Sequence, residues 1–192
     1  MISKIFEYAN DVSFDRFTRI RRAISNSGYV SSLKGSPTFY SIELNLKPLT
    51  KSEFDLVEAE LISKEDGIST FNTQIPNELN IINGDTTLTS ITVDSNSSGT
   101  SLDLSSTTGL NVGDYIQVSS NDKVYQIKTI VDSNIVTLNT GLIEDAAAND
   151  TVSIGQNVEF KLLLDNKPNV TIVPGPGFNY YQYSTFKFRE IL

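Results

Sequence analysis

The chain has 192 residues, no cysteine, no histidine and a formal net charge of −8. A chain of this length can bury one large core or two small ones. The missing cysteines exclude disulfides and thiolate metal sites, and the missing histidines exclude Ser-His-Asp triads, HExxH zinc sites and Cys-His dyads. An enzyme built from this chain would have to rely on carboxylates.

The charge is distributed unevenly along the chain. Residues 1–35 carry a net charge of +3, whereas residues 79–156 carry −7. This asymmetry suggests two surfaces with different neighbours, although plain solubility of an exposed acidic domain is the simpler interpretation. No segment approaches the ~20 apolar residues of a membrane span, so we expect a soluble, unprocessed chain without a membrane partner.

A basic segment, FDRFTRIRR, occupies residues 14–22. Its arginines are Arg16, Arg19, Arg21 and Arg22. In an extended strand they share both faces with phenylalanines, so neither face is suited to a core. We interpret the arginines as an ion-pair face at a subunit interface or within the chain, since carboxylates lie nearby. Binding to nucleic-acid phosphates is the alternative, without sequence specificity.

One strong helix signal follows a predicted strand. The strand, TFYSIELNL, alternates polar residues with Tyr40, Ile42, Leu44 and Leu46. Thr50 and Glu53 then form a capping box, which predicts an amphipathic helix near residues 51–64. Gly67 is suited to the left-handed residue just beyond its end.

The middle of the chain is rich in Ser, Thr, Asn, Asp and Gly. Short alternating segments predict strands separated by turns, as in a compact antiparallel barrel or sandwich. These segments are TLTSITV, TSLDLS, GDYIQVSS, KVYQIKTIV and NIVTLNT. We predict that they form a separate small β domain.

The loop at residues 94–105 begins like a calcium-binding EF-hand loop. Asp94, Asn96 and Ser98 alternate, and Gly99 is sixth. The twelfth residue is Ser105, however, where an EF-hand has a bidentate glutamate, and the flanking segments resemble strands. We interpret the loop as a hairpin turn and predict no metal site and no cofactor.

The last segment returns to longer strands with more aromatic residues, in the style of residues 36–76. We therefore predict a host domain made from residues 1–78 and 157–192, with residues 79–156 inserted into it. The predicted fold is mainly β. It consists of a split antiparallel β-barrel or sandwich with one short α-helix, plus the inserted small β-barrel.

No residue pattern points to catalysis. The carboxylates lie mostly in turns, as Asp114 and Asp122 do, where a structural role is expected. The glycine-rich VPGPG segment at residues 173–177 lacks the spacing of a phosphate-binding loop and predicts a bend between strands. We therefore expect a protein that is not an enzyme.

The order of these pieces resembles a family of tailed-bacteriophage distal tail and baseplate hub proteins. The resemblance begins with GSPTFYSIELNLKPLTKSEFDLVEAELISKEDGISTFNTQIP, continues with an inserted barrel like GLNVGDYIQVSSNDKVYQIKTIVDSNIVTLNTGL, and ends with VEFKLLLDN and STFKFREIL. It covers most of the chain.

The resemblance implies a structural virion protein at the tail tip or baseplate, made in the host cytoplasm. Such a protein forms a homo-oligomeric ring, a hexamer in this family, that connects the tail tube to baseplate, fibre or receptor-binding proteins. The host domain would build the ring, and the inserted domain would decorate it.

A carbohydrate-binding module that recognises host-surface glycans is the alternative function. Aromatic rings can stack on sugars, and the candidate contacts are Tyr115, Tyr125, Tyr180, Tyr181 and Tyr183. A hydrolase with paired carboxylates is a third hypothesis, which we rank last.

Overall fold

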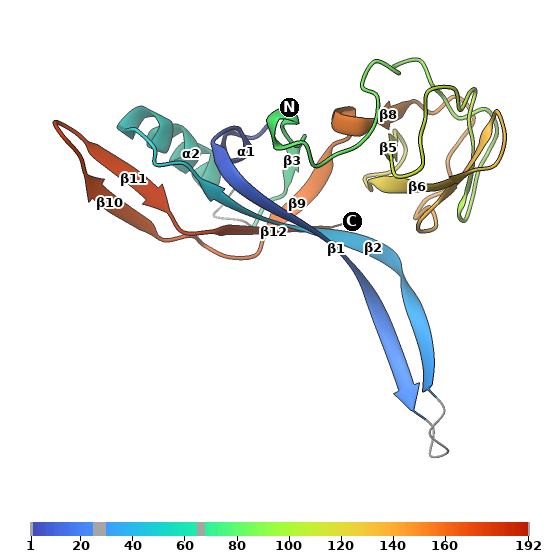
Figure 1. Ribbon diagram of the computed structural model, residues 1–192, viewed down its shortest axis with the longest axis horizontal. Coiled ribbons are helices and arrows are strands. Elements are labelled where there is room, and N and C mark those ends of the chain that lie inside the picture. Colours follow the sequence, from blue (N-terminus) through green and yellow to red (C-terminus); the bar gives the residue numbers. More distant parts are fainter. Residues whose placement is uncertain (1, 25–29, 65–67, 192) are drawn as a thin grey trace.

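The computed structural model describes residues 2–24, 30–64 and 68–191, and within this part the side chains of residues 17–38 lie outside the description. The described residues form twelve strands, all paired antiparallel, and two α-helices (Figure 1). The predicted mainly-β class is confirmed. No closed barrel is formed by the described strands, which agrees with a split barrel or sandwich.

The first sheet has five strands in the order β1-β2-β12-β9-β3. Its strands are β1 (Ala9–Ile24), β2 (Val30–Leu46), β12 (Phe186–Glu190), β9 (Phe160–Leu164) and β3 (Phe71–Thr73). Residues from the two ends of the chain therefore lie side by side. Burial alternates along β9 and β12 as the apolar spacing predicts, with one face of each strand turned to a core.

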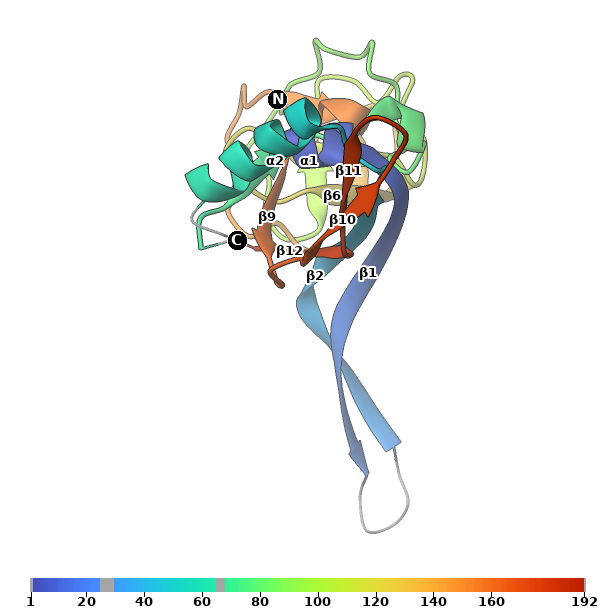
Figure 2. The same ribbon diagram turned by 90° about the vertical axis from the view of Figure 1, so that its left-hand side faces the viewer.

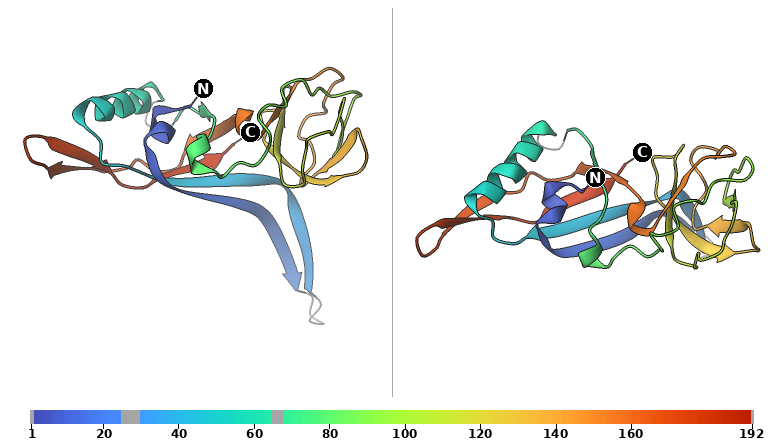
Figure 3. Two further views of the ribbon diagram at one scale, coloured as in Figure 1. Left: turned by 45° about the horizontal axis from the view of Figure 1, so that its top comes forward. Right: turned by 90° about the horizontal axis from the view of Figure 1, so that it is seen from above.

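Two helices lie on one side of this sheet, as Figure 3 shows: α1 (Lys4–Glu7) and α2 (Lys51–Ser63). The predicted capping box is confirmed, because Thr50 accepts from the Glu53 amide and the Glu53 carboxylate accepts from the Thr50 amide. Helix α1 was not predicted, because its single turn is too short for a periodic signal. Gly67 lies outside the described residues. Neither described helix is long and apolar enough to cross a membrane.

The second sheet is built from the middle of the chain, in the order β4-β7-β6-β5-β8. Its strands are β4 (Ser101–Asp103), β5 (Tyr115–Val118), β6 (Tyr125–Ile130), β7 (Ile135–Leu138) and β8 (Val152–Ile154). The strand predicted from TLTSITV is wrong, because Thr92 and Val93 form only isolated bridges. Strand β8 was not predicted, since a single short TVSIG segment carries almost no periodicity.

The buried apolar residues fall into two clusters. The first cluster lies between the first sheet and the helices, and the second cluster fills the second sheet. Tyr115 and Val124 belong to the first cluster although they lie within residues 79–156. The two clusters therefore meet where β5 and the start of β6 contact the first sheet.

Two hairpins extend from this body. We call residues 17–24 and 30–38 of the β1–β2 hairpin the arm, because β12 pairs with β2 only from Ser41 to Leu44, so that beyond Phe39 the ribbon is two-stranded. Figure 2 shows the arm projecting away from the body. The second hairpin, β10 (Val170–Pro174) and β11 (Asn179–Tyr183), lies at the opposite end from β5 and β6 (Figure 1). Its turn confirms the bend predicted from VPGPG.

The segments that enter and leave the second sheet touch at two glycines. A Cβ on Gly155 would lie 2.5 Å from the Gly84 carbonyl oxygen, and a Cβ on Gly84 would lie 2.7 Å from the Gly155 backbone. Gly155 also has φ +60, a left-handed conformation that side chains disfavour. Only glycines allow the two backbones to meet at this crossing.

We predict that Gly155→Ala is strongly destabilising, because it adds a backbone clash to a strained φ. Gly99→Ala is a matched control, since Gly99 has φ +64 but nothing within 4 Å of its Cβ position. We expect the control to cost about 1–2 kcal/mol of unfolding free energy. The clash should cost a further ~1–3 kcal/mol in Gly155→Ala. Urea denaturation measures both, and equal losses would contradict close packing at this crossing.

Candidate functional site

A buried ion pair joins the two sheets. The Lys123 ammonium lies 2.6 Å from a Glu190 carboxylate oxygen, and the two side chains are 1% and 0% exposed. Glu190 ends β12, where it follows Phe186 and Phe188 on the inward face of the strand. The strand alternation thus carries a carboxylate into the core, and Lys123, just before β6, meets it from the other sheet.

The remaining hydrogen-bonding capacity of Glu190 is used by backbone amides. The Tyr40 amide of β2 donates to the carboxylate at 3.2 Å, and the Val124 amide donates to its other oxygen at 3.4 Å. The Lys123 ammonium also lies 5.1 Å from the Phe39 ring centre and 5.3 Å from the Tyr40 ring centre. No buried polar side-chain atom among the described residues lacks a partner.

Burial and pairing act in opposite directions on both ionisable groups. Burial raises the pKa of Glu190 and lowers the pKa of Lys123, while the charge of each residue opposes the shift of the other. Burial is the largest cause in both cases. Each charge is therefore tolerable only while its partner is present, as expected for an ion pair in a low-dielectric interior.

Aromatic rings surround this ion pair at the junction. Phe14 of β1 stacks on Tyr40, with ring centres 5.1 Å apart, and meets Phe160 edge-on at 5.8 Å. Tyr115 of β5 approaches Phe14 at 6.0 Å. Such pairs stabilise beyond the area that they bury. The base of the arm is thereby locked to both sheets.

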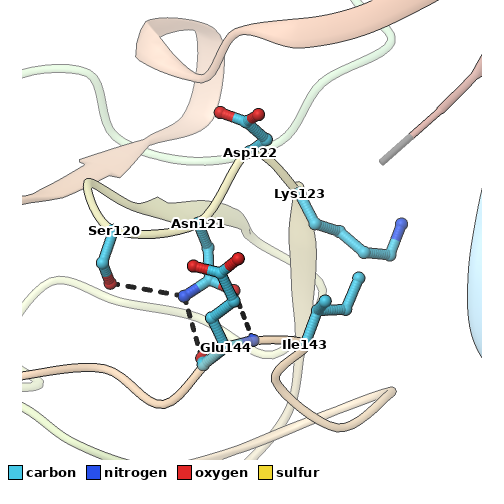
Figure 4. Close-up of a pocket in the computed structure, with 6 residues that line it drawn as sticks. All are labelled: Ser120, Asn121, Asp122, Lys123, Ile143 and Glu144. Atoms are coloured by element: carbon cyan, nitrogen blue, oxygen red, sulfur yellow. Dashed lines mark hydrogen bonds between the residues drawn. The ribbon is translucent and has the colours of Figure 1, made fainter.

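A polar hollow of about 290 Å³ lies beside the junction (Figure 4). Its lining residues are Ser120, Asn121, Asp122, Lys123, Ile143 and Glu144. The Asn121 side chain is fully engaged by the fold: its amide nitrogen donates to the Glu144 carbonyl at 3.0 Å, and its oxygen accepts from the Glu144 amide at 3.1 Å.

The other groups of this hollow are also committed, apart from the exposed Glu144. Asp122 pairs with Lys161 at 2.6 Å, and Figure 4 shows the Lys123 ammonium directed away from Asn121. Asp122 and Glu144, the two carboxylates of the hollow, are both exposed, whereas a glycosidase keeps its general acid in surroundings that raise its pKa. The hollow therefore gives the hydrolase hypothesis no support.

The structure describes one of the four arginine side chains predicted at an interface. Arg16 donates a hydrogen bond of 2.8 Å to the Gln126 side chain of β6, so it connects the base of the arm to the second sheet. The side chains of Arg19, Arg21 and Arg22 lie outside the description. Their backbones belong to the arm, where Arg21 is opposite Leu33 and Arg22 is opposite Ser32.

The tyrosines proposed as glycan contacts are mostly in the core. Tyr115, Tyr125 and Tyr183 are 8%, 0% and 5% exposed. Burial raises the pKa of Tyr125 to about 12. Tyr180 and Tyr181 are half-buried, and Tyr181 stacks on Phe54 with ring centres 4.4 Å apart. Burial thus removes three of the five from contact with a sugar in this conformation.

The loop at residues 94–105 forms the predicted turn. Two of its serines bond within the loop, with the Ser95 hydroxyl donating to Asp103 at 2.6 Å and the Ser97 hydroxyl accepting from the Asp103 amide at 2.9 Å. Within the described part of the chain, no three His, Cys, Asp or Glu side chains are grouped so that they could hold a metal ion.

The buried ion pair was not predicted from the sequence. The available signal was Glu190 itself, which continues the inward positions of the FKFRE strand and so places a charge where an apolar residue is expected.

Searches with this chain found no matching protein-family model and no matching curated protein. Function must therefore be inferred from the junction and the two projecting hairpins.

We predict that Glu190→Gln destabilises the fold by about 3–5 kcal/mol, because it leaves the Lys123 charge buried without a counter-charge. The double variant Lys123→Met/Glu190→Gln should regain at least ~1 kcal/mol, since glutamine keeps an acceptor for the amides. Asp122→Asn breaks an exposed pair and is the control, with an expected loss below about 1 kcal/mol. Urea denaturation decides, and additive losses in the double variant would contradict coupling.

We predict that Lys123→Met makes stability depend on pH. Loss of the lysine removes the charge that lowers the pKa of Glu190, so burial alone raises that pKa in the folded state. A raised folded-state pKa favours folding at low pH, and this contribution is lost as pH rises through it. Between about pH 5 and pH 8 the unfolding free energy should fall by at most ~1.4 kcal/mol per pH unit. Lys123→Met/Glu190→Gln, measured in parallel, should lack this decline.

Proposed function

We propose that this chain is a structural component of a bacteriophage tail tip or baseplate hub, where copies form a ring that connects the tail tube to baseplate or receptor-binding proteins. The observation that carries the proposal is the arm. It continues the first sheet as a two-stranded ribbon that projects from the body (Figure 2).

A ribbon of this kind is suited to contact with another subunit. Two strands without a third strand or a helix to cover them are marginal in water, and both outer edges carry unpaired backbone groups. A neighbouring subunit that covers the ribbon would satisfy these groups. Contacts in which an arm of one subunit reaches a different surface of the next are heterologous, and such contacts generate rings when the rotation closes.

The charge of the arm supports the same interpretation. Its described strands contain four basic residues and no acidic residue. Residues 79–156 carry nine acidic residues, and Asp122 is the one among them that forms an ion pair with a described side chain. Opposite charges on two surfaces of one chain favour contact between copies and set its orientation.

The described residues favour an architectural role over catalysis. The Lys123–Glu190 pair at the junction is buried, and the first hydrophobic cluster joins Phe14 and Tyr40, next to the arm, to Tyr115 of the second sheet. The protein would act through shape and interface in the virion. A carbohydrate-binding module is less well supported, because three of its five tyrosines are buried.

The test is the mass of the purified protein in solution over a concentration series, by light scattering coupled to size exclusion. We expect growth toward a closed ring, a hexamer if the family resemblance holds, and ring-shaped particles in negative-stain electron microscopy. Arg19→Glu/Arg21→Glu should weaken this assembly while leaving the monomer folded, because it reverses the charge of the arm.

The matched control is Lys51→Glu/Lys64→Glu, which changes the net charge equally but lies outside both the arm and residues 79–156. It should assemble like the wild type. Normal assembly of the arm variant would refute the role of the arm. A wild type that remains monomeric on its own and binds a host glycan on an array would support the carbohydrate-binding alternative.

A further inference from the structure

Strand β10 is exposed on both faces and is largely apolar. All five of its residues are exposed, and Val170, Ile172 and Val173 are 39%, 57% and 39% accessible. Phe178, in the turn beyond it, is 54% accessible. An apolar group of this kind at the end of a projecting hairpin is unusual for a free surface and marks an interaction site.

The whole hairpin is also uncharged. Residues 168–186 contain no Asp, Glu, Lys or Arg, although these make up 20% of the chain. Charged residues are what proteins commonly place on free strands to prevent pairing, and interface cores are depleted in them. The occupant of this edge is therefore expected to be uncharged as well.

Hydrogen bonds fix which backbone groups of β10 point outward. The Ser184 amide donates to the Asn169 carbonyl at 2.8 Å, and the Gly175 amide donates to the Phe178 carbonyl at 2.9 Å. Odd-numbered residues of β10 therefore face β11, because the bonded positions of an antiparallel pair alternate. The amides and carbonyls of Val170 and Ile172 must point away from β11, toward the open edge.

Two prolines limit this edge. Pro174 ends β10, Pro168 lies buried just before the strand, and proline has no N–H to donate. The open edge of β10 thus offers two N–H donors, at Val170 and Ile172. A strand that pairs along this edge can therefore accept only two N–H donors from β10, at Val170 and Ile172.

We propose that β10 pairs with β10 of a second copy of this chain, antiparallel and centred on Thr171. In this register Val170 lies opposite Ile172 of the second copy, and each exchanges both of its outward hydrogen bonds. Pro174, just past this exchange, has no N–H to leave unpaired. The pattern is complementary to itself about Thr171, as a two-fold contact requires.

Two other edge strands, β1 and β4, fit less well. Along β1, Asp11, Asp15 and Arg16 are exposed, and β4 carries Asp103. Pairing either strand with β10 would place charges against an apolar strand. The β10 contact is small, so we expect weak association unless other contacts add to it. It does not rest on the proposed ring.

The cysteine-free chain allows a direct test by disulfide cross-linking of Thr171→Cys. Thr171 and Thr171 of the second copy would form a non-hydrogen-bonded pair, with Cα atoms about 4.5 Å apart. This separation lies within the range of about 4.4–6.8 Å that disulfides span. The control is Gln182→Cys, whose residue lies opposite Thr171 on β11. In the proposed sheet the two Gln182 positions are separated by three strand spacings, ~14 Å.

Under mild oxidation, Thr171→Cys should form a covalent dimer at least about ten times faster than Gln182→Cys, because only the former places its thiols within bonding range. Equal rates for the two variants, fast or slow, would overturn the proposal. Thr171→Lys gives a second readout, since it sets two like charges directly opposite each other. It should halve the mass of the largest species that the wild type reaches, and an unchanged mass would also overturn the proposal.

Discussion

The arrangement of this molecule depends on the contact between Lys123 and Glu190. One ion pair, closed off from water, connects β12 of the first sheet to the turn before β6 of the second. Its carboxylate also holds the amides of Tyr40 and Val124, so the pair fixes β2 at the point where the arm begins. A buried charge pair contributes little net stability, but it tolerates few alternative geometries, and here it specifies one docking of the two sheets.

The two projecting hairpins have different characters because they are anchored differently. The arm continues β1 and β2 beyond the first sheet, in which the other half of each strand lies. The aromatic contacts of Phe14 hold the base of the arm. The β10–β11 hairpin is attached through Leu49, whose amide and carbonyl bond to Tyr181, and through the stacking of Tyr181 on Phe54. One hairpin is basic and the other uncharged. A single chain thereby presents two surfaces of different chemistry at separate places.

Local signals in the sequence predicted the local structure well. The capping box placed the start of α2 correctly, and alternation placed β9 and β12. Strand β8 and helix α1 were not predicted, because three or four residues are too few to show a periodic pattern. The tyrosines were misjudged for another reason: composition cannot tell an exposed aromatic residue from one in a core, and Tyr115 and Tyr125 are buried by segments far away in the sequence.

The candidate site could be predicted only in part for the same reason. The basic character of the arm can be read from residues 14–22, whereas its projection from the body depends on where β12 stops pairing with β2. The two partners of the buried ion pair are 67 positions apart in the chain. No local pattern could have identified Lys123 as the partner of Glu190.

The glycine crossing has a consequence for how such a chain can diversify. The strand pairs of the first sheet are complete without the segment between Gly84 and Gly155. The two ends of this segment lie side by side. A different domain could be exchanged into this position during evolution without rerouting the host sheet. One chemical condition limits the exchange. The replacing domain must supply a cation to Glu190, so its charge as well as its shape decides whether it fits.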